Sequence, residues 1–208
     1  LPVGELSSRV GLSQPLISAA AQSLGGFEAL IRWHHPTRGI VPPNEFITIA
    51  EESGFIMDLG DWVIEEACRA ASCWPEHITV AVNISAKQLI FPALPNTVAD
   101  SIRKHRLQPN RLELEVTESV FMGDSANALD VLKRLRALGV GIALDDFGTG
   151  YSSLGYLNKA VFHKLKIDGS FVRESADNRE TVAIIQSIVQ LAKGFRMTGS
   201  AEGGGDPD

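Results

Sequence analysis

The sequence has few of the features that mark secreted or membrane-embedded proteins. Only two of its 208 residues are cysteine, Cys68 and Cys73, and they stand five positions apart on different faces of a predicted helix. We therefore expect ordinary packing rather than a disulfide or a zinc site, which fits a reducing compartment. No apolar run approaches the roughly 18 residues of a membrane span. The opening LPVGELSSRV lacks the basic and apolar regions of a signal peptide.

Positive charge is also scarce. The chain carries 25 acidic residues against 19 Lys and Arg, and it has no lysine or arginine run. This argues against a DNA or RNA polymer as partner, although an acidic protein can bind a small phosphate ligand when metal ions screen its charge. We expect a cytoplasmic location, alone or as the cytoplasmic part of a larger membrane-attached protein. Because the first residue is Leu1, we expect a processed or cut chain, or a fragment.

What the chain does contain is an alternation of short apolar runs and longer segments with helical spacing. The apolar runs occupy 78–84, 111–117, 140–146 and 163–168, with a weaker candidate at 195–201. The helical segments are 43–54, 60–74, 96–107, 124–139, with Asp124 or Ser125 as N-cap, and 178–194, with Asn178 as N-cap. Strands that alternate with helices predict βα units and a parallel sheet.

Polar residues follow these strands at the point where each strand ends. They are Asn83, Glu115 with Glu118, Asp145 with Asp146, Lys166 with Asp168, and Glu202. In a (β/α)8 barrel the carboxyl ends of all strands converge on one face, where active sites are built. The alternative is a doubly wound sheet whose strand ends are merely solvated. We expect the barrel, because successive strands end in the same way.

A barrel would bring the oxygen atoms of Asn83, Glu115, Asp145 and Asp146 together. These are hard ligands that suit Mg²⁺ or Mn²⁺. Adjacent aspartates can serve two metal ions if the backbone bends between them, and two ions can activate water for an in-line phosphoryl displacement. Lys166 would supply a cation near the attacking water or a phosphate oxygen. The glycine-rich segment after Asp146 would be a mobile element over the site.

Six motifs stand in a familiar order: FEALIRW (27–33), VNISAKQL (82–89), LEVTES (114–119), DDFGTGYSSL (145–154), LKIDGSF (165–171) and AEG (201–203). With them the sequence resembles the EAL-domain phosphodiesterases, bacterial enzymes that open cyclic di-GMP to linear pGpG. The resemblance implies a modified (β/α)8 barrel whose first strand is antiparallel, and a two-metal site with Mg²⁺ or Mn²⁺. It also implies a homodimer through the face near the 145–154 loop.

The resemblance assigns a role to each matching residue. Glu28, Asn83, Glu115 and Asp145 match metal ligands, and Asp146 matches the ligand of a second metal. Lys166 matches the lysine that contacts the catalytic water, and Glu202 matches a glutamate of the metal–water network. Gln14 and Arg32 match the residues that contact the nucleotide and its phosphate. Glu118 matches the residue that anchors the DFGTGYS loop and couples it to dimerisation.

Each residue also has a purely structural interpretation. Glu118 could cap a turn, Asp168 could pair with Lys166, and Arg32 could be an ordinary surface residue. We expect His34 and His35 to be surface or loop residues, because adjacent side chains rarely converge on one ion. We expect Trp33, Trp62 and Trp74 to pack in the interior.

The sequence departs from the family at both ends. Ser13 replaces a tyrosine, Gly199 and Ser200 replace apolar strand residues, and Gly204 and Gly205 follow AEG. We therefore expect residues 1–208 to form a single EAL domain that lacks the final strand and helix.

Two other functions stay open. One is a catalytically impaired EAL module that acts as a cyclic di-GMP receptor or protein-interaction domain, and the other is a different metal-dependent barrel enzyme, such as an enolase-like one.

Overall fold

The computed structural model describes residues 10–18, 23–122, 125–148, 155, 157, 161–175 and 178–201. The strands are β1 (Val10–Ser18), β2 (Ser23–Ile31), β3 (Trp33–His35), β4 (Gly39–Val41), β5 (Thr79–Asn83), β6 (Leu112–Thr117), β7 (Gly141–Phe147), β8 (Lys164–Ile167) and β9 (Thr198–Ala201). The helices are α2 (Pro43–Ser53), α3 (Ile56–Ala71), α4 (Ala86–Leu89), α5 (Leu94–His105), α6 (Ser125–Ala137), α7 (Gly169–Glu174) and α8 (Arg179–Gly194), with 3₁₀ turns η1 (Pro109–Arg111) and η2 (Glu118–Met122).

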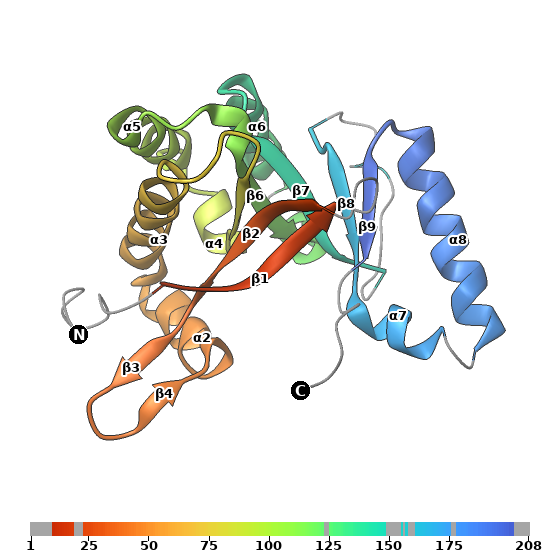
Figure 1. The fold of residues 1–208 in the computed structure, drawn as a ribbon, viewed down its shortest axis with the longest axis horizontal. Helices are drawn as coiled ribbons and strands as arrows, with labels where there is room; N and C mark the ends of the chain where they lie inside the picture. Colours follow the sequence, from red (N-terminus) through yellow and green to blue (C-terminus); the bar gives the residue numbers. More distant parts are fainter. Residues whose placement is uncertain are drawn as a thin grey trace.

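The main sheet has seven strands in the order β1-β2-β5-β6-β7-β8-β9. β1 runs antiparallel to β2, and every other neighbouring pair is parallel. A doubly wound sheet reverses its strand order at a switch point, whereas this sheet follows the chain from edge to edge. The predicted incomplete barrel is therefore confirmed: the sheet curls into a half-barrel (Figure 1). Within the described residues its two edge strands are β1 and β9.

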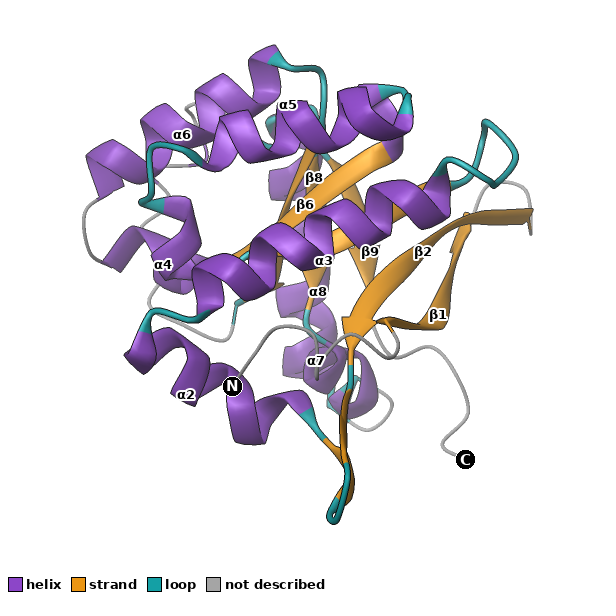
Figure 2. Ribbon diagram, turned by 90° about the vertical axis from the view of Figure 1, so that its left-hand side faces the viewer, coloured by secondary structure: helices purple, strands orange, loops and turns teal. Residues whose placement is uncertain are grey.

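Helices cover the outer face of this curved sheet. α3, α5 and α6 lie over its middle strands, and α8 lies beside β8 and β9 (Figure 2). Side chains alternate along a strand, so Leu112, Leu114 and Val116 of β6 share the face that packs in the main apolar core. Glu113 and Glu115 take the opposite face, and both are buried. The inside of the half-barrel is therefore lined by charged groups.

The predicted helices all form, with shifted ends. Gly54 adopts the left-handed conformation, with φ of 79°, and ends α2. α3 then begins at Ile56 rather than at Gly60, which lies inside the helix. Asn178 caps α8 as predicted, because its side chain accepts hydrogen bonds from the amides of Glu180 and Thr181. The N-cap prediction for Asp124 lies outside the described residues.

A short hairpin, β3–β4, projects from the sheet beside α2 (Figure 1). His34 and His35 lie in β3, so they belong to a strand rather than to a loop. The Nδ1 atom of His35 accepts hydrogen bonds from the amides of Thr37 and Arg38 and so holds the turn. Trp33 packs edge-on against Phe46 in a small second apolar cluster with α2 and α3. Trp33 and Trp62 pack against this cluster and Trp74 against the main core, but all three are half-buried rather than interior.

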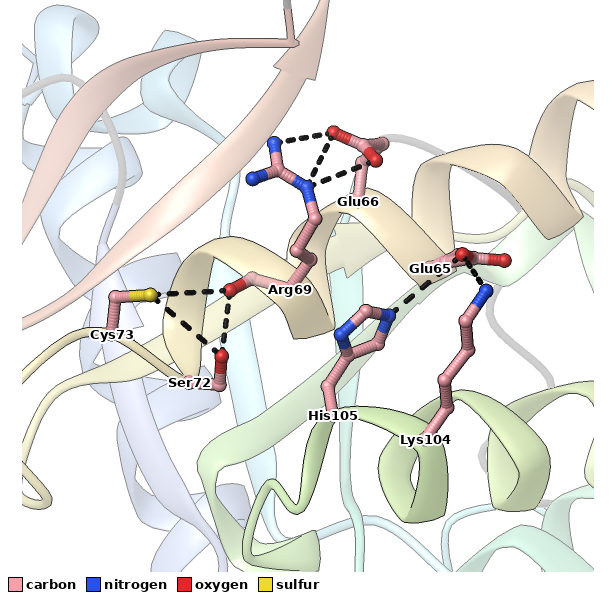
Figure 3. Close-up of polar contacts among 7 residues, drawn as sticks. All are labelled: Glu65, Glu66, Arg69, Ser72, Cys73, Lys104 and His105. Atoms are coloured by element: carbon pink, nitrogen blue, oxygen red, sulfur yellow. Dashed lines mark hydrogen bonds and ion pairs between the residues drawn. The ribbon is translucent and has the colours of Figure 1, made fainter.

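The two cysteines are both free, as expected. Cys68 is buried in α3, which fits the expected packing role, whereas Cys73 is exposed just after that helix, which does not. Figure 3 shows Cys73 next to the Arg69 carbonyl oxygen, and shows Glu65 of α3 between Lys104 and His105 of α5. These surface pairs tie α3 to α5. Among the helices that the structure describes, none is long and apolar enough to cross a membrane.

Candidate active site

The carboxyl ends of the parallel strands bring the predicted site residues onto one rim of the half-barrel. β5 and β6 pair with Asn83 opposite Glu115, and β6 and β7 pair with Thr117 opposite Asp145. The amide of Ile84 donates to the Glu115 carbonyl oxygen and extends the β5–β6 ladder by one residue. Register alone therefore places two of the predicted metal ligands directly side by side.

Glu28 and Asn83 meet across β2 and β5. The Nδ2 atom of Asn83 donates a hydrogen bond to Oε1 of Glu28 over 2.7 Å. This contact fixes the orientation of the amide, because the nitrogen faces the carboxylate and the Oδ1 atom faces away from it. Both side chains then offer oxygen atoms to the space above the strand ends.

Lys166 bridges two predicted metal ligands. Its Nζ atom lies 2.7 Å from Oε2 of Glu115 and 3.1 Å from Oδ2 of Asp145. All three side chains are buried. Burial raises the pKa of Glu115 to about 8; the Lys166 ammonium opposes this rise, and the Asp145 and Glu28 carboxylates add to it. The protein thus holds a costly buried acid that one nearby cation only partly compensates.

The chain bends between Asp145 and Asp146. Asp146 has φ of 54°, in the left-handed region, and the β7–β8 register shifts between Leu144 and Phe147. The Asp146 amide donates to Oδ1 of Asp145 over 2.9 Å. Aspartate tolerates this conformation better than most residues. The bend that a two-metal arrangement needs is present, since adjacent residues of a regular strand would point to opposite faces.

Glu118 lies at the start of η2 and reaches across to the end of β7. Its Oε1 atom accepts a hydrogen bond from the Gly148 amide over 3.1 Å. It therefore holds the first residue of the glycine-rich segment, whose residues 149–154 lie outside the described part of the chain. Asp168, which we considered as a partner of Lys166, instead caps α7 by accepting from the Ser170 amide.

The structure describes the remaining predicted site residues less completely. Arg32 follows β2, is half-buried, and donates from Nη1 to the Ile31 carbonyl oxygen. Gln14 lies in β1 opposite Glu28, and only its backbone is described. Glu202 lies outside the described residues, directly after β9. The structure thus brings together the predicted residues from β2, β5, β6, β7 and β8.

A cavity of about 430 Å³ opens beside these strand ends. Glu115 and Asn83 line it together with apolar residues of β2, α2 and α3. Ser85 and Gln88 also line it, and the sequence analysis did not single them out. The sequence does contain a signal for these two residues, because Ser followed three positions later by Gln is the pattern of a helix capping box.

The donor set fits a hard divalent cation. The Oε1 atom of Glu115 is buried without a hydrogen-bond partner among the described residues, which is the state expected of a carboxylate oxygen reserved for a ligand. Glu28 and Asn83 add two more oxygen donors nearby. As they stand, no three acidic, His or Cys side chains in the described ranges converge on one point. Lys166 occupies the place between Glu115 and Asp145 instead.

Comparisons with known proteins agree with this arrangement. The EAL domain family model matches residues 13–204. A signalling protein of uncharacterised function from Caulobacter vibrioides is 49% identical over 190 residues, which is 91% of this chain and 24% of that protein. The bifunctional diguanylate cyclase/cyclic di-GMP phosphodiesterase MucR from Pseudomonas aeruginosa is 42% identical over 194 residues, which is 91% of this chain and 28% of that protein.

The fold comparison points the same way. The structure of the PaMucR phosphodiesterase in complex with c-di-GMP superposes with a TM-score of 0.87 at 41% identity, covering 93% of this chain and 80% of that one. The fold and the family match define an α/β protein with a partial, TIM-like barrel of the EAL type. The chain belongs to the EAL domain family. It spans about a quarter of the length of the curated relatives described above.

Proposed function

We propose that this chain is a metal-dependent phosphodiesterase that hydrolyses cyclic di-GMP to linear pGpG in bacterial second-messenger signalling. The observation that carries the proposal is the buried group of Glu115, Asp145 and Lys166 at the strand ends, next to the Asn83–Glu28 pair. Homology to EAL-domain phosphodiesterases supports it. The orphaned Oε1 atom of Glu115 supports an additional cation, because a buried carboxylate oxygen is costly when it has no partner.

We assign the metal ligands as Glu28, Asn83, Glu115, Asp145 and Asp146. A bound Mg²⁺ or Mn²⁺ supplies the positive charge that activates water and stabilises the phosphoryl oxygens. The bend at Asp146 breaks the alternation of the strand, so that both aspartates can lie at the same rim and serve different ions. Glu202 has a catalytic role in the metal–water network in the proposal, on the basis of the AEG motif alone.

The other residues bind and orient. Lys166 keeps a positive charge at the acidic rim, where it can hold the attacking water or a phosphate oxygen. Arg32 and Gln14 contact the phosphate and the nucleotide in the proposal. Glu118 fixes the start of the glycine-rich segment through the Gly148 amide. The apolar side of the adjacent cavity excludes water from the reacting phosphate.

The test is cyclic di-GMP hydrolysis by the purified chain, with pGpG measured by chromatography. We expect turnover to require Mg²⁺ or Mn²⁺ and to stop on chelation. Ca²⁺ should inhibit, because its longer and looser coordination spoils the geometry for water activation. Activity that survives exhaustive chelation would rule out the metal-dependent mechanism.

A second candidate function is a cyclic di-GMP receptor without turnover. It is favoured by the Lys166 bridge, which already compensates Glu115 and Asp145 in part without a metal ion. Binding of cyclic di-GMP by calorimetry, with no pGpG formed at saturating Mn²⁺, would establish this candidate over the enzyme.

The assembly and the location are also proposals. We propose a homodimer through the face near the 145–154 loop, supported by the resemblance and by the contact that ties Glu118 to Gly148. Light scattering during size-exclusion chromatography tests it, and a monomer at all concentrations would refute it. We propose a cytoplasmic site of action, for this chain alone or as the cytoplasmic part of a larger membrane-attached protein. That residues 1–208 form a single domain also stays a prediction.

A further inference from the structure

Gln88 is a buried polar residue that the proposed mechanism does not use. It is the third residue of α4, and only 3% of its surface is exposed. Its Oε1 atom accepts a hydrogen bond from the Ser85 amide over 3.1 Å, while the Ser85 hydroxyl accepts from the Gln88 amide. This reciprocal pair is a capping box, and it fixes the backbone of Ser85 at the first turn of α4.

The capping box is only two residues from a proposed metal ligand. Asn83 ends β5, Ile84 is held by the Glu115 carbonyl oxygen, and Ser85 is held by Gln88. The chain after Asn83 is therefore clamped at two successive amides. This clamp leaves little freedom for the Asn83 carboxamide, whose Nδ2 atom lies 2.7 Å from Glu28.

Gly60 makes room for this clamp from a different helix. A Cβ atom on Gly60 would lie 1.6 Å from Nε2 and 2.6 Å from Cδ of Gln88, so the Gln88 side chain would have to move. A glycine inside a helix lowers the stability of that helix relative to alanine. The position of Gln88 therefore gives a physical reason for glycine at this place in α3.

We propose that Gln88, seated against Gly60, is a positioning residue for the metal-binding oxygen atoms of Asn83 and Glu28. The inference rests on the proposed function and deepens it. Gln88 acts through the Ser85 amide, which sets the path of the chain as it leaves Asn83. Asn83 in turn orients Glu28 by the hydrogen bond across β2 and β5. Gly60, Gln88, Ser85 and Asn83 all line the same cavity.

The chemistry of the amide allows a sharp test. Glutamate at position 88 retains the oxygen that accepts from Ser85 and is a favoured residue in a capping box. Methionine has a similar length but lacks that acceptor. A positioning role therefore predicts that Gln88→Glu retains function and that Gln88→Met loses it. If the Nε2 donor served a ligand directly, Gln88→Glu would fail as badly as Gln88→Met.

The readout is the Mn²⁺ concentration that gives half of the metal-induced rise in melting temperature, measured without substrate. Groups that support metal ligands typically change affinity by about 10-fold to 100-fold. We expect Gln88→Met to raise this concentration about 10-fold and Gln88→Glu to stay within about 3-fold of the wild type. The control is Lys87→Met, which loses the bond from Lys87 to the Glu51 carbonyl oxygen but keeps the capping box, and should match the wild type.

A double-mutant cycle tests the contact between the helices. Gly60→Ala should displace Gln88 and weaken Mn²⁺ binding about as much as Gln88→Ala does, about 10-fold. The double variant should also be about 10-fold weaker, because alanine at position 88 leaves space for the new methyl group. Independent effects would instead multiply to about 100-fold.

The outcomes separate this inference from the function that it rests on. If Gln88→Met binds Mn²⁺ like the wild type, or if the cycle is additive, the positioning role is wrong, whatever the hydrolysis assay gives. If the wild type responds to Mn²⁺ but makes no pGpG, the proposed function fails while the comparison of variants still decides the role of Gln88. A wild-type chain that shows no Mn²⁺ response overturns the inference together with the metal site.

Discussion

Lys166 and Glu115 form a buried ion pair at the carboxyl ends of β8 and β6, with 2.7 Å between Nζ and Oε2. The side chain of Glu115 has no exposed surface and that of Lys166 has 4%. The same ammonium lies 3.1 Å from Asp145. A second pair, Lys164 with Glu113, lies on the same two strands one layer below, with 2.6 Å between Nζ and Oε1. The lower layer offers a comparison without proposed metal ligands, and Glu113 there also lies 2.8 Å from Nε2 of His163.

Lys166→Met should impair both stability and hydrolysis. Removing one partner of a buried pair typically costs about 3–5 kcal/mol, because the remaining charge is uncompensated. We expect metal-free unfolding in urea to show a loss in this range, and added Mn²⁺ to restore part of it. Hydrolysis of cyclic di-GMP at saturating Mn²⁺ should fall at least about 100-fold, the usual effect of removing one electrostatic group from an active site.

Lys164→Met is the control for this prediction. It also breaks a largely buried pair, so it should destabilise the protein, but it leaves the upper layer intact. Hydrolysis per folded molecule should stay within a few-fold of the wild type. Equal losses of hydrolysis in the two variants would show that Lys166 acts only on the fold.

Asp146 should be dispensable for the fold and essential for hydrolysis. Its φ of 54° suits Gly, Asn and Asp, whereas other residues are strained there by about 1–2 kcal/mol. We expect Asp146→Gly and Asp146→Asn to keep the metal-free melting temperature and Asp146→Ala to lower it. All three should lose hydrolysis, because the proposed second metal loses its ligand. If Asp146→Gly were strongly destabilised without metal, the carboxylate would be structural and its assignment wrong.

Much of this arrangement follows from the sequence, and the rest depends on register and on contacts between distant helices. The polar residues Asn83, Glu115 and Asp145 could be assigned to strand ends because an apolar run stops at each of them. The order of parallel strands then brings the ends together. The partner of Lys166 could not be predicted, because a pattern of alternation gives the face of a strand but not its offset from the next strand.

Two further features could not be predicted from the sequence pattern, for other reasons. The sequence pattern predicts a helix that starts at Gly60, since glycine is a poor helix former, and the close approach of Gln88 to Gly60 inside α3 is a contact between distant elements. The bend at Asp146 was required by the two-metal hypothesis, but nothing in the sequence fixes a φ value. Such features arise where long-range packing overrides local preference.

Arg111 should matter for stability and not for hydrolysis. It is buried at the amino-terminal end of β6, away from the site, and it donates to three carbonyl oxygens, those of Ala71, Trp74 and Ile78. It thereby joins the end of α3 to the start of β5. Arg111→Met should lower the free energy of unfolding by about 2–3 kcal/mol, because buried carbonyl groups lose a charged donor. Arg103→Met, which breaks only an exposed pair with Asp100, should change it by less than about 1 kcal/mol.

Asp168 should give a pH-dependent contribution to stability. Its side chain caps α7, and hydrogen bonds from the hydroxyl and then the amide of Ser170 hold the pKa of Asp168 below its ordinary value of 3.8. A carboxyl group whose pKa is lower in the folded state stabilises the protein above its unfolded pKa. That contribution is lost as the pH falls through the folded pKa. Asp168→Ala should therefore cost about 1 kcal/mol at pH 7, the usual value of an N-cap.

Asn caps helices as well as Asp but does not titrate, so Asp168→Asn is the matched control. Urea unfolding from pH 7 downwards should show a constant gap between the wild type and Asp168→Ala until the pH nears 3.8, and a shrinking gap below it. The gap between Asp168→Asn and Asp168→Ala should stay constant over the same range. If both gaps shrink together, the loss at low pH belongs to the rest of α7 and the capping carboxylate is not its cause.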